Sequence, residues 1–194
     1  MRVHADKKAI RVLGISESFV KGVSKKSVLA GVVMRGDMLI DGFAFGTATV
    51  GGMDATDAVL NLYRQLGRED VNLLMLNGCV ISWFNVIDLP IVHQKLNLPL
   101  ICVTYEESDG LEKYFRAHFD DWRERVAVHE RNGARELVML HTGYHLYSRY
   151  FGMGKITSKR VLNKFTLQGA VPEPLRVSRL LANSALNAGA IPSV

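Results

Sequence analysis

One histidine pair and one cysteine are of types that could carry chemistry by themselves. His141 and His145 stand four positions apart, a spacing at which two imidazoles on one face of a helix can bind one metal ion. Their stretch is β-like and contains Gly143, and four strand residues span about 13 Å, so we expect no shared ion. Cys79 has six histidines available as a base, but no local signature marks an orienting group or an oxyanion hole. We therefore interpret Cys79 and Cys102 as separate, buried thiols.

Basic residues are concentrated at the two ends of the chain. Residues 1–35 carry eight Lys and Arg against two acids, and residues 149–194 carry seven against one, whereas the middle has a net charge of −7. A fold that brings the ends together would present a basic face to a polyanion, although ordinary solvated surface is the alternative. The residues that we expect to bind nucleic acid are Arg35, Lys159, Arg160, Lys164, Arg176 and Arg179. The aromatic residues that could stack on unpaired bases, or face the core instead, are Tyr144, Tyr147, Tyr150 and Phe151.

Composition and local patterns exclude several other classes of protein. The chain has 194 residues, a net charge of +5 and 48% hydrophobic residues, which excludes a disordered chain and allows a sizeable core. Gly46 and the pair Gly51–Gly52 match neither the P-loop nor the dinucleotide-binding pattern. The N-terminus lacks the apolar stretch of a signal peptide, and every apolar run is shorter than the roughly 20 residues of a membrane span. We expect one domain over residues 1–194, cytoplasmic and without membrane contact.

The order of predicted elements defines a fold class. Strands are predicted over Arg11–Ile15, Ser27–Met34, Met38–Thr49, Leu73–Leu76, Pro99–Thr104 and Glu136–His141. Helices are predicted from Asp54 to about Gly67, from Asn85 or Asp88 to Leu96, and over Asp109–Phe119, Asp121–Arg131, Thr157–Phe165 and Glu173–Leu186. Three strands in a meander, followed by alternating helices and strands, predict an α/β fold. The sheet is mixed, helices cover both of its faces, and the order is that of the ribonuclease-H-like architecture.

Five motifs, spread from about residue 9 to residue 189, carry a resemblance to a known family. They are Arg11–Val12–Leu13–Gly14–Ile15, Val32–Val33–Met34–Arg35–Gly36, Gly52–Met53–Asp54–Ala55–Thr56, Trp83–Phe84–Asn85–Val86–Ile87–Asp88 and Val171–Pro172–Glu173–Pro174–Leu175–Arg176–Val177. Together they resemble an archaeal endonuclease-V-like family, domain of unknown function 99. The resemblance implies a ribonuclease-H-type fold. In active nucleases of that fold, carboxylates at strand ends hold Mg²⁺ ions that bridge the scissile phosphate and activate water.

At three positions this chain lacks an acid that the family carries. Ser16 begins the pair Ser16–Glu17 where the family has two aspartates, and Gly51 and Asn77 each replace one aspartate. Each lost carboxylate removes about 4 kcal/mol of attraction per positive charge, for charges about 4 Å apart at an effective dielectric constant of about 20. We therefore expect no cofactor, or only weakly bound Mg²⁺ or Mn²⁺.

Three nearby acids remain as candidate catalytic residues. Glu17 follows the first strand, Asp54 lies three residues beyond Gly51, and Asp88 begins the helix after the central strand. The alternative is a surface acid for Glu17 and helix N-caps for Asp54 and Asp88.

We interpret the chain as a nucleic-acid-binding protein of endonuclease-V-like fold with an impaired nuclease centre. Its expected partner is DNA or RNA, with single-stranded and branched forms included. Two alternatives stay open: an active Mg²⁺-dependent endonuclease with a rearranged site, and an interaction scaffold that binds a protein and no nucleic acid. The sequence does not decide whether the protein is an enzyme.

Overall fold

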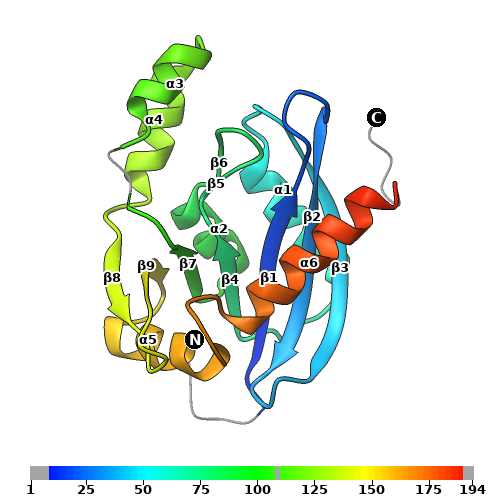
Figure 1. Ribbon diagram of the computed structural model, residues 1–194, viewed down its shortest axis with the longest axis vertical. Coiled ribbons are helices and arrows are strands. Elements are labelled where there is room, and N and C mark those ends of the chain that lie inside the picture. Colours follow the sequence, from blue (N-terminus) through cyan, green and yellow to red (C-terminus); the bar gives the residue numbers. More distant parts are fainter. Residues whose placement is uncertain (1–8, 108–109, 190–194) are drawn as a thin grey trace.

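The framework of the protein is a seven-stranded sheet with the order β3-β2-β1-β4-β7-β9-β8 (Figure 1). The computed structural model describes residues 9–107 and 110–189. The strands are β1 (Arg11–Ser18), β2 (Lys26–Arg35), β3 (Ile40–Thr49), β4 (Leu73–Asn77), β7 (Leu100–Thr104), β8 (Glu136–Met139) and β9 (His145–Phe151). The three central strands β1, β4 and β7 are parallel to one another, and the outer pairings on both sides are antiparallel. The carboxyl ends of the central strands therefore meet at one edge of the sheet.

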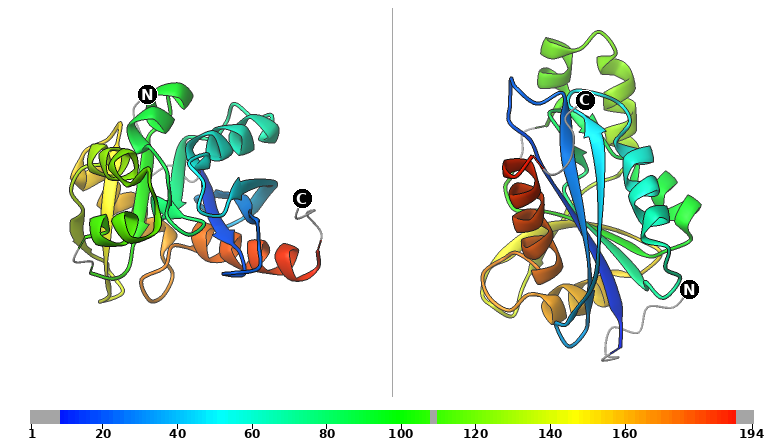
Figure 2. Two further views of the ribbon diagram at one scale, coloured as in Figure 1. Left: turned by 90° about the horizontal axis from the view of Figure 1, so that it is seen from above. Right: turned by 90° about the vertical axis from the view of Figure 1, so that its right-hand side faces the viewer.

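Helices cover both faces of this sheet, with α1 and α6 on opposite sides in Figure 2. α1 (Ala55–Leu66) and α2 (Leu89–Leu96) pack on one face, and α5 (Lys155–Phe165) and α6 (Glu173–Asn187) pack on the other. α3 (Glu112–His118) and α4 (Trp122–Arg131) form an arm at one end of the molecule. A separate hairpin consists of β5 (Val80–Ile81) and β6 (Asn85–Val86). The predicted mixed α/β fold, with helices on both faces, is confirmed.

Most predicted elements are present, with small shifts at their ends. The predicted antiparallel meander corresponds to β1, β2 and β3. The strand predicted over Glu136–His141 ends at Met139. No separate strand is predicted at β9. Its segment, His145–Phe151, mixes aromatic and polar residues and contains a single aliphatic residue, so its apolar pattern is weak. The predicted helix start at Asp109 lies outside the described residues, and α3 begins at Glu112.

None of the helices in residues 9–107 and 110–189 is long and apolar enough to cross a membrane.

α6 crosses β1 at short range because β1 carries small residues where the two meet. A Cβ atom at Gly14 would lie only 2.6 Å from the Cβ of Pro174. Two residues further on, Ser16 Oγ donates to the Leu175 carbonyl (3.1 Å) and accepts from Ser178 Oγ (2.7 Å). The packing of α6 therefore depends on the absence of larger side chains on this face of β1.

Gly14→Ala is expected to destabilise the protein by about 1–3 kcal/mol, because the added methyl group collides with Pro174 and must displace α6. Urea unfolding of the variant and the parent measures this difference. Gly154→Ala is the matched control, since a Cβ at Gly154 meets no atom within 4 Å. Equal stability of Gly14→Ala and the parent protein would show that α6 does not need this close approach.

Candidate functional site

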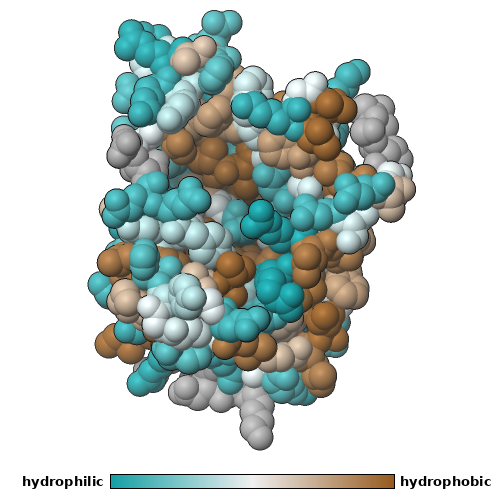
Figure 3. Space-filling model, viewed as in Figure 1, coloured by the Kyte–Doolittle hydropathy of each residue, from teal (hydrophilic) through white to brown (hydrophobic). Residues whose placement is uncertain are grey.

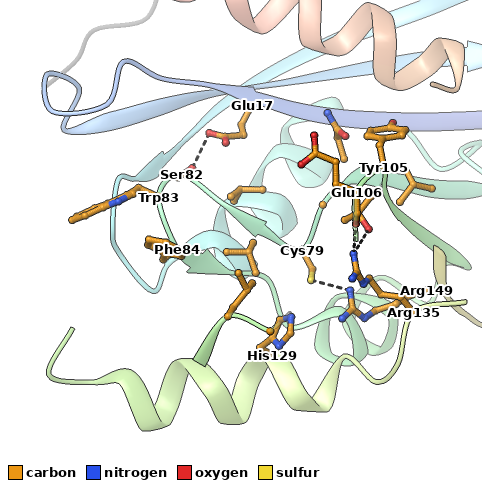
Figure 4. Close-up of a pocket in the computed structure, with 18 of the residues that line it drawn as sticks. Glu17, Cys79, Ser82, Trp83, Phe84, Tyr105, Glu106, His129, Arg135 and Arg149 are labelled. Carbon is orange, nitrogen blue, oxygen red and sulfur yellow. Dashed lines mark hydrogen bonds between the residues drawn. The ribbon is translucent and has the colours of Figure 1, made fainter. Parts of the chain in front are cut away.

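A pocket of about 650 Å³ opens at the carboxyl ends of the central strands (Figure 4). Glu17 comes from β1, Asn77 from β4, and Tyr105 and Glu106 follow β7. The lining also includes Arg149 from β9. Segments far apart in the sequence thus bring acidic, neutral and basic side chains to one cavity.

Glu17 is the candidate acid that faces this pocket. Ser82 Oγ donates to Glu17 Oε2 (3.2 Å), and Ser82 Oγ also lies 2.5 Å from Ser27 Oγ. Burial raises the pKa of the Glu17 carboxyl group, although hydrogen bonds from the backbone and side chain of Ser82 oppose this effect. Glu17 is therefore a partly desolvated acid with one neighbouring hydroxyl donor.

The three positions without acid have different surroundings. Ser16 is buried and hydrogen-bonded to α6, whereas Asn77 lines the pocket. Gly51 has a φ of +72°, and a Cβ there would lie 3.0 Å from the indole ring of Trp83. An aspartate at Gly51 would therefore be both strained and crowded.

Asp54 belongs to the junction between β3 and α1. Its carboxylate accepts from Thr49 N (2.9 Å), Thr49 Oγ1 (2.6 Å) and Asn85 Nδ2 (2.6 Å), and it lies 3.6 Å from Lys26 Nζ. Burial acts to raise the pKa of Asp54, but the hydrogen bonds from Thr49 and Asn85 prevail and lower it. Asp54 precedes α1, as the N-cap interpretation expects, but its side chain makes no capping hydrogen bond. It ties two elements together outside the set of residues that line the pocket.

Asp88 has the structural role that the N-cap interpretation predicts. Its Oδ1 accepts from Ile91 N (3.1 Å) at the start of α2. Its Oδ2 lies 2.8 Å from an Arg131 guanidinium nitrogen. The structure therefore brings Glu17 and Asn77 to one pocket and places Asp54 and Asp88 elsewhere.

The wall opposite Glu17 is cationic, a feature absent from the sequence-based prediction. Arg149 is only 7% exposed, and its Nε donates to the Gly133 carbonyl (2.7 Å). Arg135 Nη1 donates to Thr104 Oγ1 (3.0 Å) and to the Glu106 carbonyl (2.9 Å). These arginines lie on or near β9 and β8, where isolated basic residues in the sequence give no signal of a shared site.

An aromatic turn borders the same pocket and was also not predicted. Ser82, Trp83 and Phe84, between β5 and β6, have φ values of +47°, +54° and +69°, a rare run of left-handed residues without glycine. The buried Arg125 holds this turn, because its guanidinium donates to the carbonyls of Phe84, Gly52 and Gly51 (2.9 Å each). Figure 3 shows hydrophobic side chains gathered beneath the α3–α4 arm.

The residues predicted to bind nucleic acid fall into two groups. Arg35 pairs with Asp37 (2.7 Å) and Arg176 with Glu173 (2.6 Å). Within the described part of the chain, the others make no ion pair: Lys159, Arg160 and Lys164 on α5, and Arg179 on α6. α5 lies at the opposite end of the molecule from the α3–α4 arm (Figure 1). The free cations of α5 are therefore distant from the aromatic turn.

The four aromatic residues predicted to stack or to pack inward do not form one surface. Tyr147 donates to Glu107 (2.8 Å) and Tyr150 to Glu136 (2.6 Å), whereas Phe151 packs against the core. Tyr144 is exposed.

The donor groups of the pocket do not fit a magnesium site. Mg²⁺ prefers hard oxygen ligands, usually including one or two carboxylates. The described lining holds the carboxylates of Glu17, Glu106 and Glu107, but Asn77 is neutral, the Ser16 hydroxyl is engaged with α6, and Glu107 accepts from Tyr147. Over residues 9–107 and 110–189, no group of three His, Cys, Asp or Glu side chains is placed to hold a metal ion, and His141 and His145 belong to no such group.

Comparison with solved structures defines the class of fold. Endonuclease V of Ciona intestinalis, in complex with a DNA that contains an inosine, has a TM-score of 0.63 at 11% identity, over 93% of this chain and 87% of that chain. A protein of unknown function from Archaeoglobus fulgidus has a TM-score of 0.79 at 25% identity, over 91% and 98%. The fold is therefore endonuclease-V-like, as the resemblance implied.

Sequence comparison gives the family. The chain belongs to the Endonuclease dU family, whose pattern it matches over residues 8–186. The UPF0215 protein of the archaeon Pyrobaculum aerophilum is 34% identical over 174 residues, which cover 89% of this chain and 92% of that protein.

Glu17→Gln is expected to stabilise the protein at neutral pH. Burial raises the pKa of Glu17 in the folded state, so the free energy of unfolding falls as pH rises from the unfolded pKa of about 4.3 through the folded value. Glutamine carries no charge and keeps an oxygen that accepts from Ser82. In urea unfolding, the two proteins should have similar stability below that unfolded pKa, and the variant should be more stable at neutral pH.

Glu69→Gln is the control for this change, since Glu69 is exposed and its substitution should alter stability little at either pH. A Glu17→Gln variant less stable than the parent at neutral pH would contradict the assignment of Glu17 as a desolvated acid.

Proposed function

We propose that this protein binds nucleic acid and that its capacity to cleave is impaired. The proposal rests mainly on the edge of the sheet where β1 and β4 end. There Glu17 lies near the neutral Asn77, and the hydroxyl group of Ser16 is hydrogen-bonded to α6. Glu106 and Glu107 also line the pocket, but among the described residues they form no group with Glu17 that is placed to hold a metal ion, so little charge is gathered to compensate the dehydration of a divalent cation. Cleavage that depends on such a cation is therefore disfavoured, while binding through other groups is retained.

Four features support nucleic-acid binding. The α5 residues Lys159, Arg160 and Lys164 lack acidic partners within the described ranges, so their charges are free for phosphate groups. Arg135 and Arg149 add positive charge to the pocket wall. The likeness to Ciona endonuclease V, which was solved with DNA, supports the same class of partner. The half-buried rings of Trp83 and Phe84 favour unpaired bases, on which aromatic side chains can stack.

The triple variant Lys159→Ala/Arg160→Ala/Lys164→Ala is expected to bind nucleic acid more weakly and with less dependence on salt. If all three side chains contact phosphate, the slope of log K against log salt should fall in magnitude by about 2 for a single strand, since each contact contributes about 0.7. Anisotropy titrations with labelled single-stranded, duplex and branched DNA and RNA, between about 50 and 200 mM salt, measure this slope.

The matched control is Arg64→Ala/Lys95→Ala, which removes exposed cations from α1 and α2 and should leave the slope unchanged. If the parent protein binds none of these nucleic acids at about 50 mM salt, the proposal fails and the interaction-scaffold alternative gains support. Binding with an unchanged slope in the triple variant would exclude α5 as the binding surface.

We expect the bound nucleic acids to remain intact in the presence of Mg²⁺ or Mn²⁺, because the described lining of the pocket contains no set of acids placed to hold such an ion. Denaturing gels of substrates with and without an inosine or a deoxyuridine measure cleavage. Metal-dependent cleavage that is lost in Glu17→Gln but kept in Asp57→Asn, an exposed control acid of α1, would establish the active-nuclease alternative instead.

A further inference from the structure

The two cysteines of the chain meet in the core next to the pocket. Cys79 follows β4, directly after Asn77 and Gly78, and Cys102 lies on β7. The sequence contains no other cysteine. β4 and β7 are adjacent parallel strands, in which Cys102 pairs with Leu76, three residues before Cys79, and both cysteines belong to one cluster of the core. Both thiols are free and buried, as the sequence predicted, but the structure makes them a pair.

Cys79 and Cys102 differ in access. Cys79 is only 3% exposed, yet it lines the pocket, and in Figure 4 its sulfur points toward the cationic wall. Cys102 is buried in the central strand β7. A small reagent that enters the pocket therefore reaches the sulfur of Cys79 first.

The charge next to Cys79 favours its reactive form. Arg149 Nη1 contacts Cys79 Sγ at 3.5 Å. Arg149 is buried and forms no ion pair with a carboxylate of the described chain. A buried cation without an anion is costly, and a thiolate at Cys79 would supply the missing negative charge.

Other groups around Cys79 act in the same direction. The hydrogen bond from Cys102 lowers the pKa of Cys79 to about 7 despite burial, and the charge of Arg149 and the amide of Asn132 also lower it. The pKa of Cys102 is raised by the hydrogen bond to Cys79 and by burial. Burial and the neighbouring Arg149 and Arg135 lower the pKa of His129, which disfavours a positive charge on its ring.

We propose that Cys79 is an oxidation site that reacts with hydroperoxides and then closes a reversible disulfide with Cys102. In the first step the Cys79 thiolate attacks one peroxide oxygen, the O–O bond breaks, and the departing oxygen takes a proton, giving a sulfenic acid and water or an alcohol. In the second step the Cys102 sulfur attacks Cys79, the S–O bond breaks, and water leaves. The two sulfurs lose two electrons in total, and the peroxide gains them.

The experiment treats the reduced, full-length protein with hydrogen peroxide and measures intact mass and free thiols. The expected product is a monomer lighter by two hydrogen atoms, without free thiols, which dithiothreitol converts back to the starting mass. Cys102→Ser should stop at a Cys79 sulfenic acid that dimedone traps. Cys79→Ser, the matched control, should keep its single thiol reduced under the same conditions.

A second measurement concerns the role of Arg149. At pH 7, iodoacetamide should alkylate Cys79 before Cys102, because Cys79 lines the pocket beside the Arg149 guanidinium, whereas Cys102 is buried in β7. Arg149→Met should slow this reaction and Arg149→Lys should largely restore it. If Arg149→Met does not fold, the peroxide experiment with Cys79→Ser and Cys102→Ser still tests the proposed disulfide.

Two outcomes would overturn the proposal. One is oxidation of Cys79 in the parent protein to higher acids without loss of the Cys102 thiol. The other is equal reactivity of the two cysteines toward alkylation. Neither outcome depends on nucleic-acid binding, so this test and that of the proposed function can fail separately.

Discussion

The close contact between α6 and β1 is the constraint on which the site depends most. Gly14 allows Pro174 to approach the strand, and Ser16 then exchanges hydrogen bonds with the first turns of α6. Because successive side chains of a strand point to opposite faces, this contact directs Ser16 toward α6 and Glu17 toward the pocket. The face of β1 that could have carried a second acid is thus occupied by helix packing.

A second constraint sets the shape of the pocket. Three consecutive left-handed residues, Ser82 to Phe84, cost backbone free energy and persist only where their surroundings hold them. Arg125 provides that hold by joining the carbonyls of Phe84 and Gly51, while Asp121 pairs with its guanidinium (2.7 Å). The arm formed by α3 and α4 therefore fixes the aromatic turn, and with it one rim of the cavity.

The sequence predicts the elements of this fold better than the site that they build. The meander, the helix after Gly52 and the cap at Asp88 follow from local patterns of apolar spacing and capping. Contacts between distant residues leave no such pattern. Ser16 and Ser178 are 162 positions apart, and Cys79 and Arg149 are 70 apart, so neither partnership is visible along the chain.

The missing acids also have different physical settings. At Gly51 an aspartate would face the ring of Trp83 in a left-handed conformation, and at Ser16 it would place a charge between β1 and α6. Nothing in the structure explains Asn77, which lines the pocket with room for an acid. An aspartate in place of Asn77 would add a carboxylate at the end of β4 without a change in packing, whereas an aspartate at Ser16 or Gly51 would first require α6 or the aromatic turn to move. Packing therefore limits where an acid can stand around this pocket, and the buried Arg149 beside Cys79 adds positive charge to the same cavity.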